Sequence, residues 1–376
     1  MPGTNVSLLP IGIPKDQALQ LVEVLSEVNY KIGRFDEKVK SSQIRESLIQ
    51  IFSLKESVES TRIEGTQVTF TDMLEEKSER NPRWEIIEIS NYQRALQTGY
   101  ERIKNGYPIT SRLIKELHEI LMADGRGSTQ SSGEFRKVQN FIGPTNDMKD
   151  ATFIPVSPDR IDAYMENLEF YLNKHPFGEA LSTDHIPQDL YVFHENTDSI
   201  VKAAIIHAQF ESIHPFLDGN GRLGRILIVL SLIQFGIISQ PIFFVSEELE
   251  KERPRYYDLL NGVRGDRPNW EAWIQFFLKA SNRMADKIHQ KFVAAEQLAV
   301  KGLRKCETES EKNVWLYTFS NPFVTAKEVA EELAITQNTA RKALKSLVEK
   351  DLLFAETEKK RNKKYRNYDL MRVLRD

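Results

Sequence analysis

The sequence has few of the features that would place a protein outside the cell or in a membrane. Its 376 residues include a single cysteine, Cys306, which excludes an intramolecular disulfide and suits a reducing cytosol. The start of the chain, residues 1–15, has no basic segment followed by a continuous apolar run, so no signal peptide is indicated. The apolar run Ile226–Ile238 is too short to cross a bilayer. We therefore expect a soluble, cytoplasmic protein that does not contact membranes.

The chain also lacks an excess of charge of either sign. It has 51 lysines and arginines against 54 aspartates and glutamates, which leaves a net charge of -3. Such a balance argues against a polycation that coats nucleic acid or membranes. His207 is expected to be a buried core residue. Five other histidines show no metal-ligand spacing with Cys306 or with each other, so no zinc site is expected: His118, His175, His185, His194 and His289.

One string of twelve residues, His214–Arg225 (HPFLDGNGRLGR), concentrates the groups that can carry chemistry. It contains an imidazole, a carboxylate, an amide, two guanidinium groups and three glycines. The preceding segment, Ser199–Ile213, reads as a buried helix, and Ile226–Ile238 after the string reads as a central core helix. The glycines therefore open a helix, where free N–H groups and the positive end of the helix dipole bind anions.

The side chains of this string predict a site for a metal-bound polyphosphate. Arg222 and Arg225 are three residues apart and can face one polyanion. Asp218 can carry a hard cation that is shared with phosphate oxygens. His214 is a candidate proton acceptor because imidazole titrates near neutral pH. Residues 219–224 also spell G-x-G-x-x-G, but a helix rather than a strand precedes them, which disfavours a dinucleotide-binding site.

The same string resembles the signature of the Fic family, HxFx[DE]GNGRxxR, and fills every specified position. The resemblance extends over roughly Ser41–Ser281. Fic enzymes mostly transfer AMP from ATP to a protein hydroxyl. The resemblance therefore implies a protein adenylyltransferase that uses ATP and Mg²⁺ and modifies serine, threonine or tyrosine, in other proteins or in itself.

By this resemblance, the residues of the string take distinct roles. His214 is the catalytic base and Asp218 is the Mg²⁺ ligand. Donors at a helix start stabilise the charge that develops on a phosphate. The nucleotide-binding candidates are Gly219, Asn220 and Gly221 at the α-phosphate, with Arg222 and Arg225 at the β- and γ-phosphates.

A second pattern lies upstream, where a helix is expected to end. The segment STRIEG, from Ser60 through Glu64 to Gly65, matches the inhibitory motif [ST]xxxE[GN] of the Fic family, and Gly65 suits a helix C-terminus. Ser60 and Glu64 share one helix face. The resemblance implies an autoinhibitory helix, about residues 41–65, whose Glu64 binds the Arg225 guanidinium in a bidentate manner. Taken alone, the pattern also fits an ordinary solvated glutamate near a helix end.

Residues 123–158 change from helical patterns to strand-like ones. Two short apolar segments around a polar turn, RKVQNFIG and ATFIP, predict a β-hairpin. The stretch Gly133–Arg136 before it resembles the entry to the Fic flap, whose edge strand would pair with an extended segment of a protein substrate. Ile142 and Gly143 in this region are further nucleotide-binding candidates.

Two tyrosines downstream, Tyr256 and Tyr257, have two interpretations. They stand at the spacing from the signature at which the family places aromatic rings against adenine. Stacking of a base on such a ring is physically reasonable, but a position in the hydrophobic core would explain the two residues equally well.

The rest of the chain predicts further helices and an extended start. Residues 1–14 are expected to be an extended arm and His175–Asp198 a loop. Residues 16–54 carry helical patterns that Gly33 and the polar run near Lys38–Gln43 are expected to interrupt. The remaining helices are expected at Ser111–Met122, capped by Thr110, at Ile161–Asn173, and at Trp270–Ala285, the last helix of the core.

The C-terminal part, from about residue 286, reads as a separate unit. Helices at Ala326–Leu333 and from about Thr336 to Lys350 are joined by a tight turn, which is a helix-turn-helix pattern. Strands at Leu352–Ala355 and Lys364–Asp369 flank a tip, 359–366, with six basic residues and no acid. The unit resembles a winged-helix domain. Its partner is predicted to be DNA or, since acidic residues offset the basic ones on the helices, a docking protein.

The sequence thus predicts a mainly α protein with a Fic-type helical core, a small β-hairpin flap and a C-terminal winged helix. The expected domains are 1–110, which includes the inhibitory helix, 111–285, the catalytic core, and 286–376. Two alternative functions stay open. In the first, the same site transfers another phosphate-linked group or removes AMP. In the second, the chain is a DNA-binding regulator whose core senses nucleotide. The oligomeric state also stays open, with a homodimer as one option.

Overall fold

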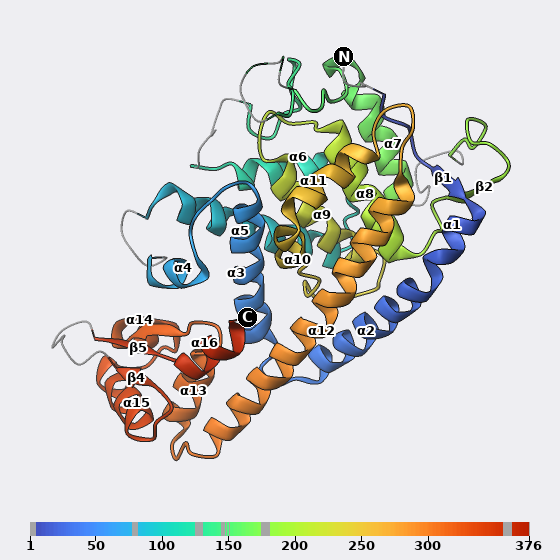
Figure 1. Ribbon diagram of the computed structural model, residues 1–376. Helices are drawn as coiled ribbons and strands as arrows, with labels where there is room; N and C mark the ends of the chain where they lie inside the picture. Colours follow the sequence, from blue (N-terminus) through green and yellow to red (C-terminus); the bar gives the residue numbers. More distant parts are fainter. Residues whose placement is uncertain are drawn as a thin grey trace. The chain divides into compact units, whose positions relative to one another are not determined.

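The computed structural model describes residues 5–76, 82–124, 131–143, 147, 149, 151–173, 181–355 and 363–375. Within these ranges the protein is mainly helical and carries two small antiparallel sheets (Figure 1). The chain divides into two compact units. The first combines Met1–Asp36, Glu56–Val68 and Pro82–Ala285, and the second combines Glu37–Lys55, Thr69–Asn81 and Asp286–Asp376. Each unit therefore draws on segments that lie far apart in the sequence.

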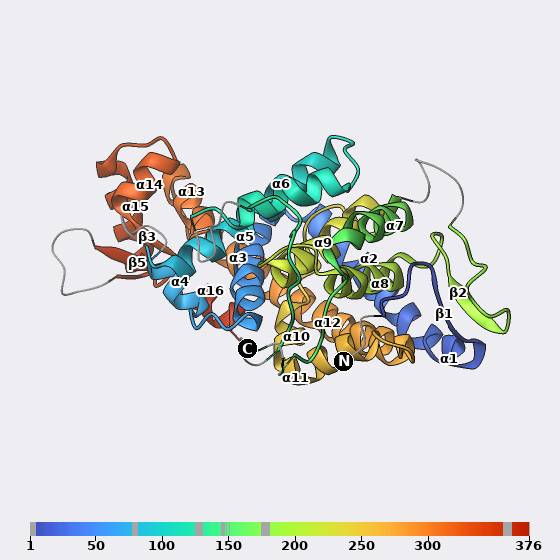
Figure 2. The same cartoon turned by 90° about the horizontal axis from the view of Figure 1, so that it is seen from above.

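The core of the first unit is a pair of buried helices. α8 (Ser199–Ile213) and α9 (Asn220–Gln234) lie side by side in both views (Figures 1 and 2). Every residue of α8 after Ser199 is buried, and α9 is buried from Arg222 to Leu232. This burial on all faces agrees with sequences that are apolar on nearly every side. The loop that joins the two helices is thus fixed at both ends.

Three further helices surround this pair, and the second and third of them agree closely with predicted segments. α5 (Trp84–Lys104) packs on α6 (Ser111–Leu121) and on α9, and α7 (Ile161–Asn173) packs on α8. The side chain of Thr110 caps α6 by accepting a hydrogen bond from the N–H of Leu113.

The other short elements of the first unit include a two-stranded sheet that the sequence did not predict. β1 (Ile11–Pro14) pairs antiparallel with β2 (Leu190–Phe193), and Ile11 lies opposite Phe193. The expectation of a loop throughout His175–Asp198 is therefore wrong for β2, while residues 175–180 lie outside the described residues. The remaining short elements are α1 (Lys15–Gln20), η2 (Pro158–Arg160), α10 (Ser246–Lys251) and α11 (Arg253–Gly262).

Three long helices contribute residues to both units, and their bounds differ from the prediction. α2 (Val22–Ser41) continues through Gly33, where an added Cβ would meet nothing within 4 Å, so this exposed glycine does not break the helix. α3 (Arg45–Ile63) begins after a short break, later than the expected start of the inhibitory helix near residue 41. α12 (Trp270–Leu303) extends well beyond the predicted end at Ala285, since no glycine or proline interrupts it before Gly302.

The second unit contains the helix-turn-helix and the strands that were predicted for the C-terminal part. The side chains of Thr325 and Thr336 cap its two helices, and Glu328 completes a capping box. Its three strands form one antiparallel sheet in the order β3-β5-β4. The elements are α4 (Phe70–Glu76), α13 (Glu309–Tyr317), β3 (Phe323–Thr325), α14 (Ala326–Glu332), α15 (Gln337–Glu349), β4 (Phe354–Ala355), β5 (Lys364–Arg366) and α16 (Tyr368–Leu374).

Two predicted features are changed or only partly described. The strand expected at Lys364–Asp369 ends at Arg366, and α16 begins two residues later. Of the basic tip, residues 359–362 lie outside the described residues. In the flap region the described residues carry one antiparallel bridge, between Ile142 and Phe153, in place of the two strands that were expected.

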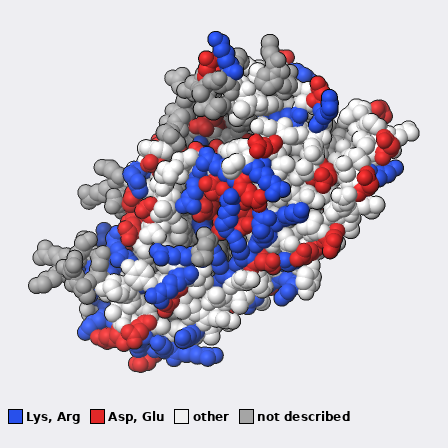
Figure 3. All heavy atoms as spheres, viewed as in Figure 1, with Lys and Arg blue, Asp and Glu red and all other residues white. Residues whose placement is uncertain are grey.

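Charge on the surface is mixed. On the face shown in Figure 3, basic and acidic side chains are interspersed and neither sign covers the whole face. Within the described part of the chain, no helix combines the length and the apolar character needed to cross a membrane.

Candidate active site

The string His214–Arg225 forms the loop between α8 and α9 and the first turn of α9. α8 ends at Ile213 and His214 follows it as the C-cap, with a left-handed backbone and φ of 49°. Gly219 is left-handed with φ of 76° just before α9 begins. The amide side chain of Asn220 closes this loop on itself, because it accepts from the N–H of Phe216 at 2.9 Å and donates to its carbonyl at 2.9 Å. The side chain of Asn220 therefore fixes the shape of the loop. Its backbone N–H is one of those at the start of α9 that have no partner within the helix.

His214 is partly buried and carries a neutral imidazole. Burial lowers the pKa of His214 to about 3, and the guanidinium groups of Arg264 and Arg136 act in the same direction. Its Nδ1 lies 3.9 Å from Oε2 of Glu211, one helical turn earlier. At neutral pH the ring is therefore unprotonated, which is the form that can accept a proton.

Arg225 is almost wholly buried and is bound by residues of α3 and the turn after it. Its Nε donates to the hydroxyl of Ser60 at 2.8 Å, and its Nη2 donates to the Ser60 carbonyl at 2.9 Å and to Oε1 of Glu64 at 2.7 Å. The expected bidentate contact with Glu64 is therefore wrong. Since Ser60 occupies Nε, the carboxylate binds through one oxygen to one nitrogen.

The Glu64 carboxylate also lies against the first turn of α9. A Cβ placed on Gly221 would collide with Oε1 of Glu64. Burial raises the pKa of Glu64, but the charge and the hydrogen bond of Arg225 together with the charge of Arg222 outweigh burial and leave that pKa below its ordinary value. An ionised carboxylate thus sits at the positive end of a helix dipole, where an anion is favoured. Gly65 follows with a left-handed φ of 94°, which agrees with its predicted place at a helix end.

Arg222 and Asp218 form a further pair of charged residues at the start of α9. Arg222 is buried, with Nη1 3.4 Å from Oε2 of Glu88 and Nη2 3.6 Å from Oδ1 of Asp218. Asp218 is exposed and also accepts from the N–H of Gly219 at 2.6 Å. Arg222 is therefore ion-paired with Glu88 and Asp218 while Arg225 is ion-paired with Glu64, and the charges of both guanidinium groups lower the pKa of Glu64.

The donor set at Asp218 fits Mg²⁺ bound together with a polyphosphate. Among the residues that the structure describes, no group of three or more His, Cys, Asp or Glu side chains could hold a metal. Mg²⁺ typically binds through one or two carboxylates and completes its shell with phosphate oxygens and water. A single exposed carboxylate beside an anion site matches that pattern.

The two tyrosines have different environments. Tyr256 is buried, its hydroxyl is 2.8 Å from Nε2 of the buried His207, and its ring lies near Trp273. Tyr256 is thus a buried core residue, which is one of the two interpretations that the sequence left open. Tyr257 is partly buried and donates to the carbonyl of Ile63 at 3.3 Å, next to Glu64. Of the pair, Tyr257 is the one that lies beside the site.

Three buried polar residues that contact the loop were not predicted to belong to the site. Arg136 donates to the carbonyl of His214 at 2.9 Å, and its own N–H donates to the carbonyl of Pro215 at 2.9 Å. Glu211 fills the space over Gly224, where a Cβ would collide with it, and burial raises its pKa to about 7. His118 contacts the carbonyl of Asp218, and burial lowers its pKa to about 4.

The sequence offered only weak signals for these three residues. Arg136 ends the Gly133–Arg136 stretch, and Glu211 stands one turn before His214 on α8. His118 lies on the apolar face of α6, which is the ordinary place of a core histidine. Ile142 and Gly143 lie at the bridge to Phe153 in the flap, and the described residues give no contact between them and the loop.

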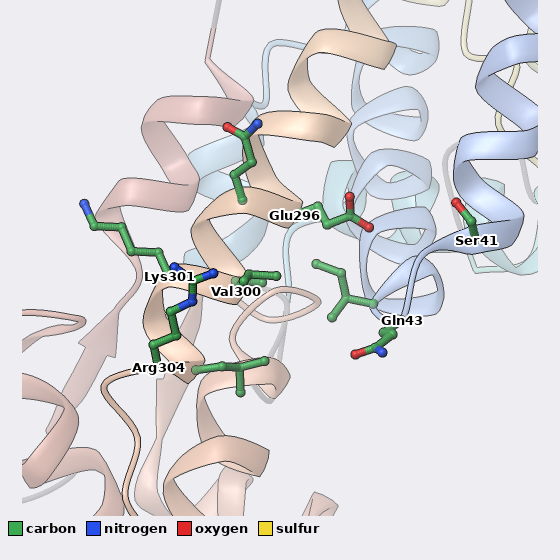
Figure 4. A pocket seen from close by; sticks show the side chains of 10 residues that line it. Ser41, Gln43, Glu296, Val300, Lys301 and Arg304 are labelled. Atoms are coloured by element: carbon green, nitrogen blue, oxygen red, sulfur yellow. The ribbon is translucent and has the colours of Figure 1, made fainter.

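A separate hollow of about 550 Å³ lies in the second unit (Figure 4). It is lined by α12 and by the segment from α2 to α3, with Ser41 and Gln43 on one side and Glu296, Val300, Lys301 and Arg304 on the other. Its residues share nothing with the loop between α8 and α9, which belongs to the first unit.

Two family models and several curated proteins match parts of this chain. A model described as Fic/DOC family matches residues 108–232, and one described as Fic/DOC family N-terminal matches residues 22–101. Protein adenylyltransferase Fic of Drosophila erecta is 30% identical over 152 residues, which is 40% of this chain and 24% of that protein. Protein adenylyltransferase fic-1 of Caenorhabditis elegans is 28% identical over 184 residues, covering 46% of this chain and 30% of the relative. This chain thus spans less than a third of the length of these two curated relatives.

Solved structures share the fold. A Fic family protein from Desulfovibrio desulfuricans G20 superposes with a TM-score of 0.56 at 18% identity, over 92% of this chain and 95% of that one. Fic-1 from Caenorhabditis elegans gives a TM-score of 0.50 at 19% identity, over 75% of this chain and 78% of the other.

Proposed function

The chain belongs to the Fic/DOC family, and from that membership we propose that it transfers AMP from ATP to serine, threonine or tyrosine hydroxyls of target proteins. The observation that carries the proposal is the loop between α8 and α9. Within six residues it combines a neutral imidazole at His214, an exposed carboxylate at Asp218 and the open start of a helix at Gly219. These are the base, the metal ligand and the anion site that nucleotidyl transfer needs.

In the proposed reaction the hydroxyl oxygen of the target forms a bond to the α-phosphorus of ATP. The bond between that phosphorus and the oxygen that bridges to the β-phosphate breaks, and pyrophosphate leaves. His214 accepts the proton of the hydroxyl at its unprotonated ring nitrogen. Backbone N–H groups at Asn220 and Gly221 stabilise the added charge on the α-phosphate, because they are fixed at the start of α9 before the reaction. The N–H of Gly219 already donates to the Asp218 carboxylate.

The other charged residues bind the leaving part of the nucleotide. Arg225 is assigned to the γ-phosphate and Arg222 to the β-phosphate. Asp218 would hold Mg²⁺, which when bound neutralises the charge of the phosphates. Tyr257 is retained as the residue beside the adenine, and the edge at Ile142 is the proposed docking place for an extended segment of the protein substrate.

The contacts of Arg225 support autoinhibition as part of the proposal. Glu64 engages the guanidinium that is assigned to the γ-phosphate, and its carboxylate lies at Gly221, where a phosphate would approach. While this contact persists, the carboxylate repels the triphosphate and keeps its α-phosphate out of line with the incoming hydroxyl. The active fraction is then set by the free-energy difference between the engaged and released states of Glu64.

ATP labelled separately at the α- and γ-phosphates distinguishes this reaction from its alternatives. Label from the α-phosphate should appear on protein with release of pyrophosphate, and label from the γ-phosphate should not. Transfer of the γ-label without the α-label would replace the proposal by a kinase-like reaction. Protein that already carries AMP, incubated without ATP, tests for removal of the group.

A second candidate function concerns α15 in the second unit. Its exposed face carries side chains of the kind that contact DNA, and Thr336 caps the start of this helix. A helix start can bind a phosphate. The exposed face of α15 is not uniformly basic, since Nζ of Lys345 lies 3.4 Å from Oε1 of Glu349. We propose that this unit binds duplex DNA, with protein docking as the competing outcome. The exposed residues are Gln337, Asn338, Arg341, Lys342 and Lys345.

Binding of the full-length protein to a fluorescent DNA duplex at two salt concentrations tests this candidate. Binding should weaken as salt rises, because phosphate contacts release counterions. Exchange of both Arg341 and Lys342 for glutamate should abolish it, whereas Lys279→Glu on α12 serves as a control with the same kind of charge change. Absence of a salt-dependent shift would remove the DNA role.

A further inference from the structure

His118 lies on the buried face of α6, and both of its ring nitrogens have hydrogen-bond partners. Nδ1 accepts a hydrogen bond from the N–H of Gly133 at 2.9 Å. Because a backbone N–H can only donate, Nδ1 carries no proton and the proton of the neutral ring is on Nε2. Nε2 then donates to the carbonyl of Asp218, 3.0 Å away. Two partners far apart in the sequence thus fix one tautomer of this ring.

The same ring contacts the loop at two further places. It stacks on Phe216 with ring centroids 3.8 Å apart and planes 7° from parallel. A Cβ on Gly219 would lie 3.5 Å from Nε2, so the ring also bounds the residue that precedes α9. His118 therefore supports the loop from Phe216 to Gly219. This support adds to the hydrogen bonds between the Asn220 side chain and the backbone of Phe216.

The contact with Gly133 extends this support to the flap entry. Gly133 begins the Gly133–Arg136 stretch, has a left-handed φ of 81° and donates its N–H to the ring. Arg136, at the end of the same stretch, binds the carbonyl groups of His214 and Pro215. The flap entry is thus joined to the loop at both of its ends, once directly through Arg136 and once through the imidazole of His118.

We propose that His118 is a positioning residue that holds Asp218 and the start of α9 in register with the flap entry. Its catalytic consequence rests on the proposed AMP transfer, whereas its tautomer and its contacts do not. The hydrogen bond from Nε2 is the essential contact, because it binds the backbone carbonyl of Asp218. The carboxylate of that residue is the one assigned to Mg²⁺. Loss of an outer partner of this kind typically lowers activity roughly 10–100-fold.

Three substitutions separate the contributions of the ring. His118→Gln places an amide N–H near the position of Nε2 and retains a donor to Asp218. His118→Asn places an amide oxygen near the position of Nδ1 and retains only the acceptor for Gly133. His118→Phe retains the stacking on Phe216 and neither hydrogen bond. Exposed His194 supplies the matched control as His194→Gln.

The variants are compared in the Glu64→Gly background by kcat and KM for ATP and by the thermal unfolding midpoint. We expect His118→Phe and His118→Asn to lose roughly 10–100-fold in kcat, His118→Gln to recover most of that loss, and His194→Gln to match the parent. Activities that follow the unfolding midpoints, with no advantage of glutamine over asparagine, would show a merely structural histidine and overturn the proposal.

A spectroscopic readout makes the test independent of the reaction. In the ¹⁵N spectrum of the imidazole rings at pH 7, the His118 ring should show the tautomer protonated at Nε2, and its signal should be assigned by its absence from His118→Gln. A ring protonated at Nδ1 contradicts the proposal. If the Glu64→Gly parent shows no AMP transfer, the proposed function fails, and the ring spectrum still decides whether His118 is held as described.

Discussion

Nη2 of Arg225 lies 2.7 Å from Oε1 of Glu64, a contact between residues 161 positions apart in the sequence. The two partners differ in accessibility, because the Arg225 side chain is 1% exposed and that of Glu64 is 36% exposed. The carboxylate can therefore move into solvent while the guanidinium stays in place. An Arg225 freed in this way would remain in position for a phosphate, so the contact is suited to reversible inhibition.

Removal of the carboxylate should activate the protein. Glu64→Gly frees Nη2 of Arg225 and clears the approach to Gly221, so we expect transfer of α-label from ATP to rise at least tenfold. A tenfold change corresponds to about 1.4 kcal/mol between the engaged and released states. The matched control is Asp184→Gly, which removes an exposed carboxylate from a turn and should leave the rate unchanged. An unchanged rate in Glu64→Gly at saturating ATP would make Glu64 an ordinary carboxylate near a helix end.

Removal of the guanidinium should not have the same effect. Arg225→Ala also breaks the contact with Glu64, but it deletes the residue assigned to the γ-phosphate. We therefore expect no activation, and the double variant Glu64→Gly/Arg225→Ala should behave like Arg225→Ala alone in the same label-transfer assay. An active double variant would separate Arg225 from nucleotide binding.

Ser60 should contribute to the same inhibition with a smaller effect. Ser60→Ala removes the hydroxyl that accepts from Nε of Arg225 but leaves the backbone carbonyl that accepts from Nη2. A hydrogen bond to a charged group contributes about 1.5–3 kcal/mol to stability. We expect a lower unfolding midpoint and an increase in label transfer below that of Glu64→Gly. Ser231→Ala in α9 is the control, since Ser231 is also buried but bonds to its own helix.

Protein stability should decrease as the pH rises toward neutrality, in part because of Glu56. Burial raises the pKa of Glu56 from 4.5 to about 7, although Ser246 donates to its carboxylate through both its N–H and its hydroxyl. A carboxyl with a raised pKa binds more protons in the folded state. Its stabilising contribution is complete below pH 4.5 and is lost as the pH approaches 7.

The free energy of unfolding should therefore fall by up to about 1.4 kcal/mol per pH unit for this group. Unfolding midpoints measured from pH 5 to pH 7 should decline less in Glu56→Gln than in the wild type. Some decline should remain, since burial raises the pKa of Glu211 to about 7 as well. Identical profiles for the two proteins would contradict the assignment to Glu56.

Arg136 should be required both for stability and for the geometry of the loop. Its guanidinium donates to the carbonyl groups of Val138, Val156 and His214, which Arg136→Met would leave without these donors. Each buried polar group without a partner costs about 1–3 kcal/mol. We expect a clearly lower unfolding midpoint and loss of label transfer at temperatures where the variant is still folded. Arg136→Lys should recover only part of the unfolding midpoint and of the label transfer, because one ammonium cannot reach all three carbonyls.

The helices around the site could be predicted from local signals. Ser199–Ile213 and Ile161–Asn173 were expected with the bounds that α8 and α7 have, because their apolar patterns are long and no glycine or proline interrupts them. Thr110 was expected as a cap for the same reason, since a cap depends on its own few neighbours.

The remaining features depend on contacts between distant segments. Pairing of β1 with β2 joins residues that no local pattern connects, so Leu190–Phe193 was expected to be a loop. The role of the Asn220 side chain could not be foreseen either, because its partner Phe216 becomes adjacent only through the left-handed residues of the loop. The use of Ser60 at Nε of Arg225 likewise depends on how α3 packs against α9.

The central claim is that His214 activates a hydroxyl for attack on the α-phosphate of ATP, and one comparison tests it most directly. Glu64→Gly and Glu64→Gly/His214→Ala are incubated with ATP labelled at the α-phosphate, and label on protein is measured alongside the unfolding midpoint. We predict strong labelling by the first protein and a loss of roughly 10²–10⁴-fold in the second at a similar midpoint. Equal labelling of protein by the two variants would contradict the assignment of His214 as the base.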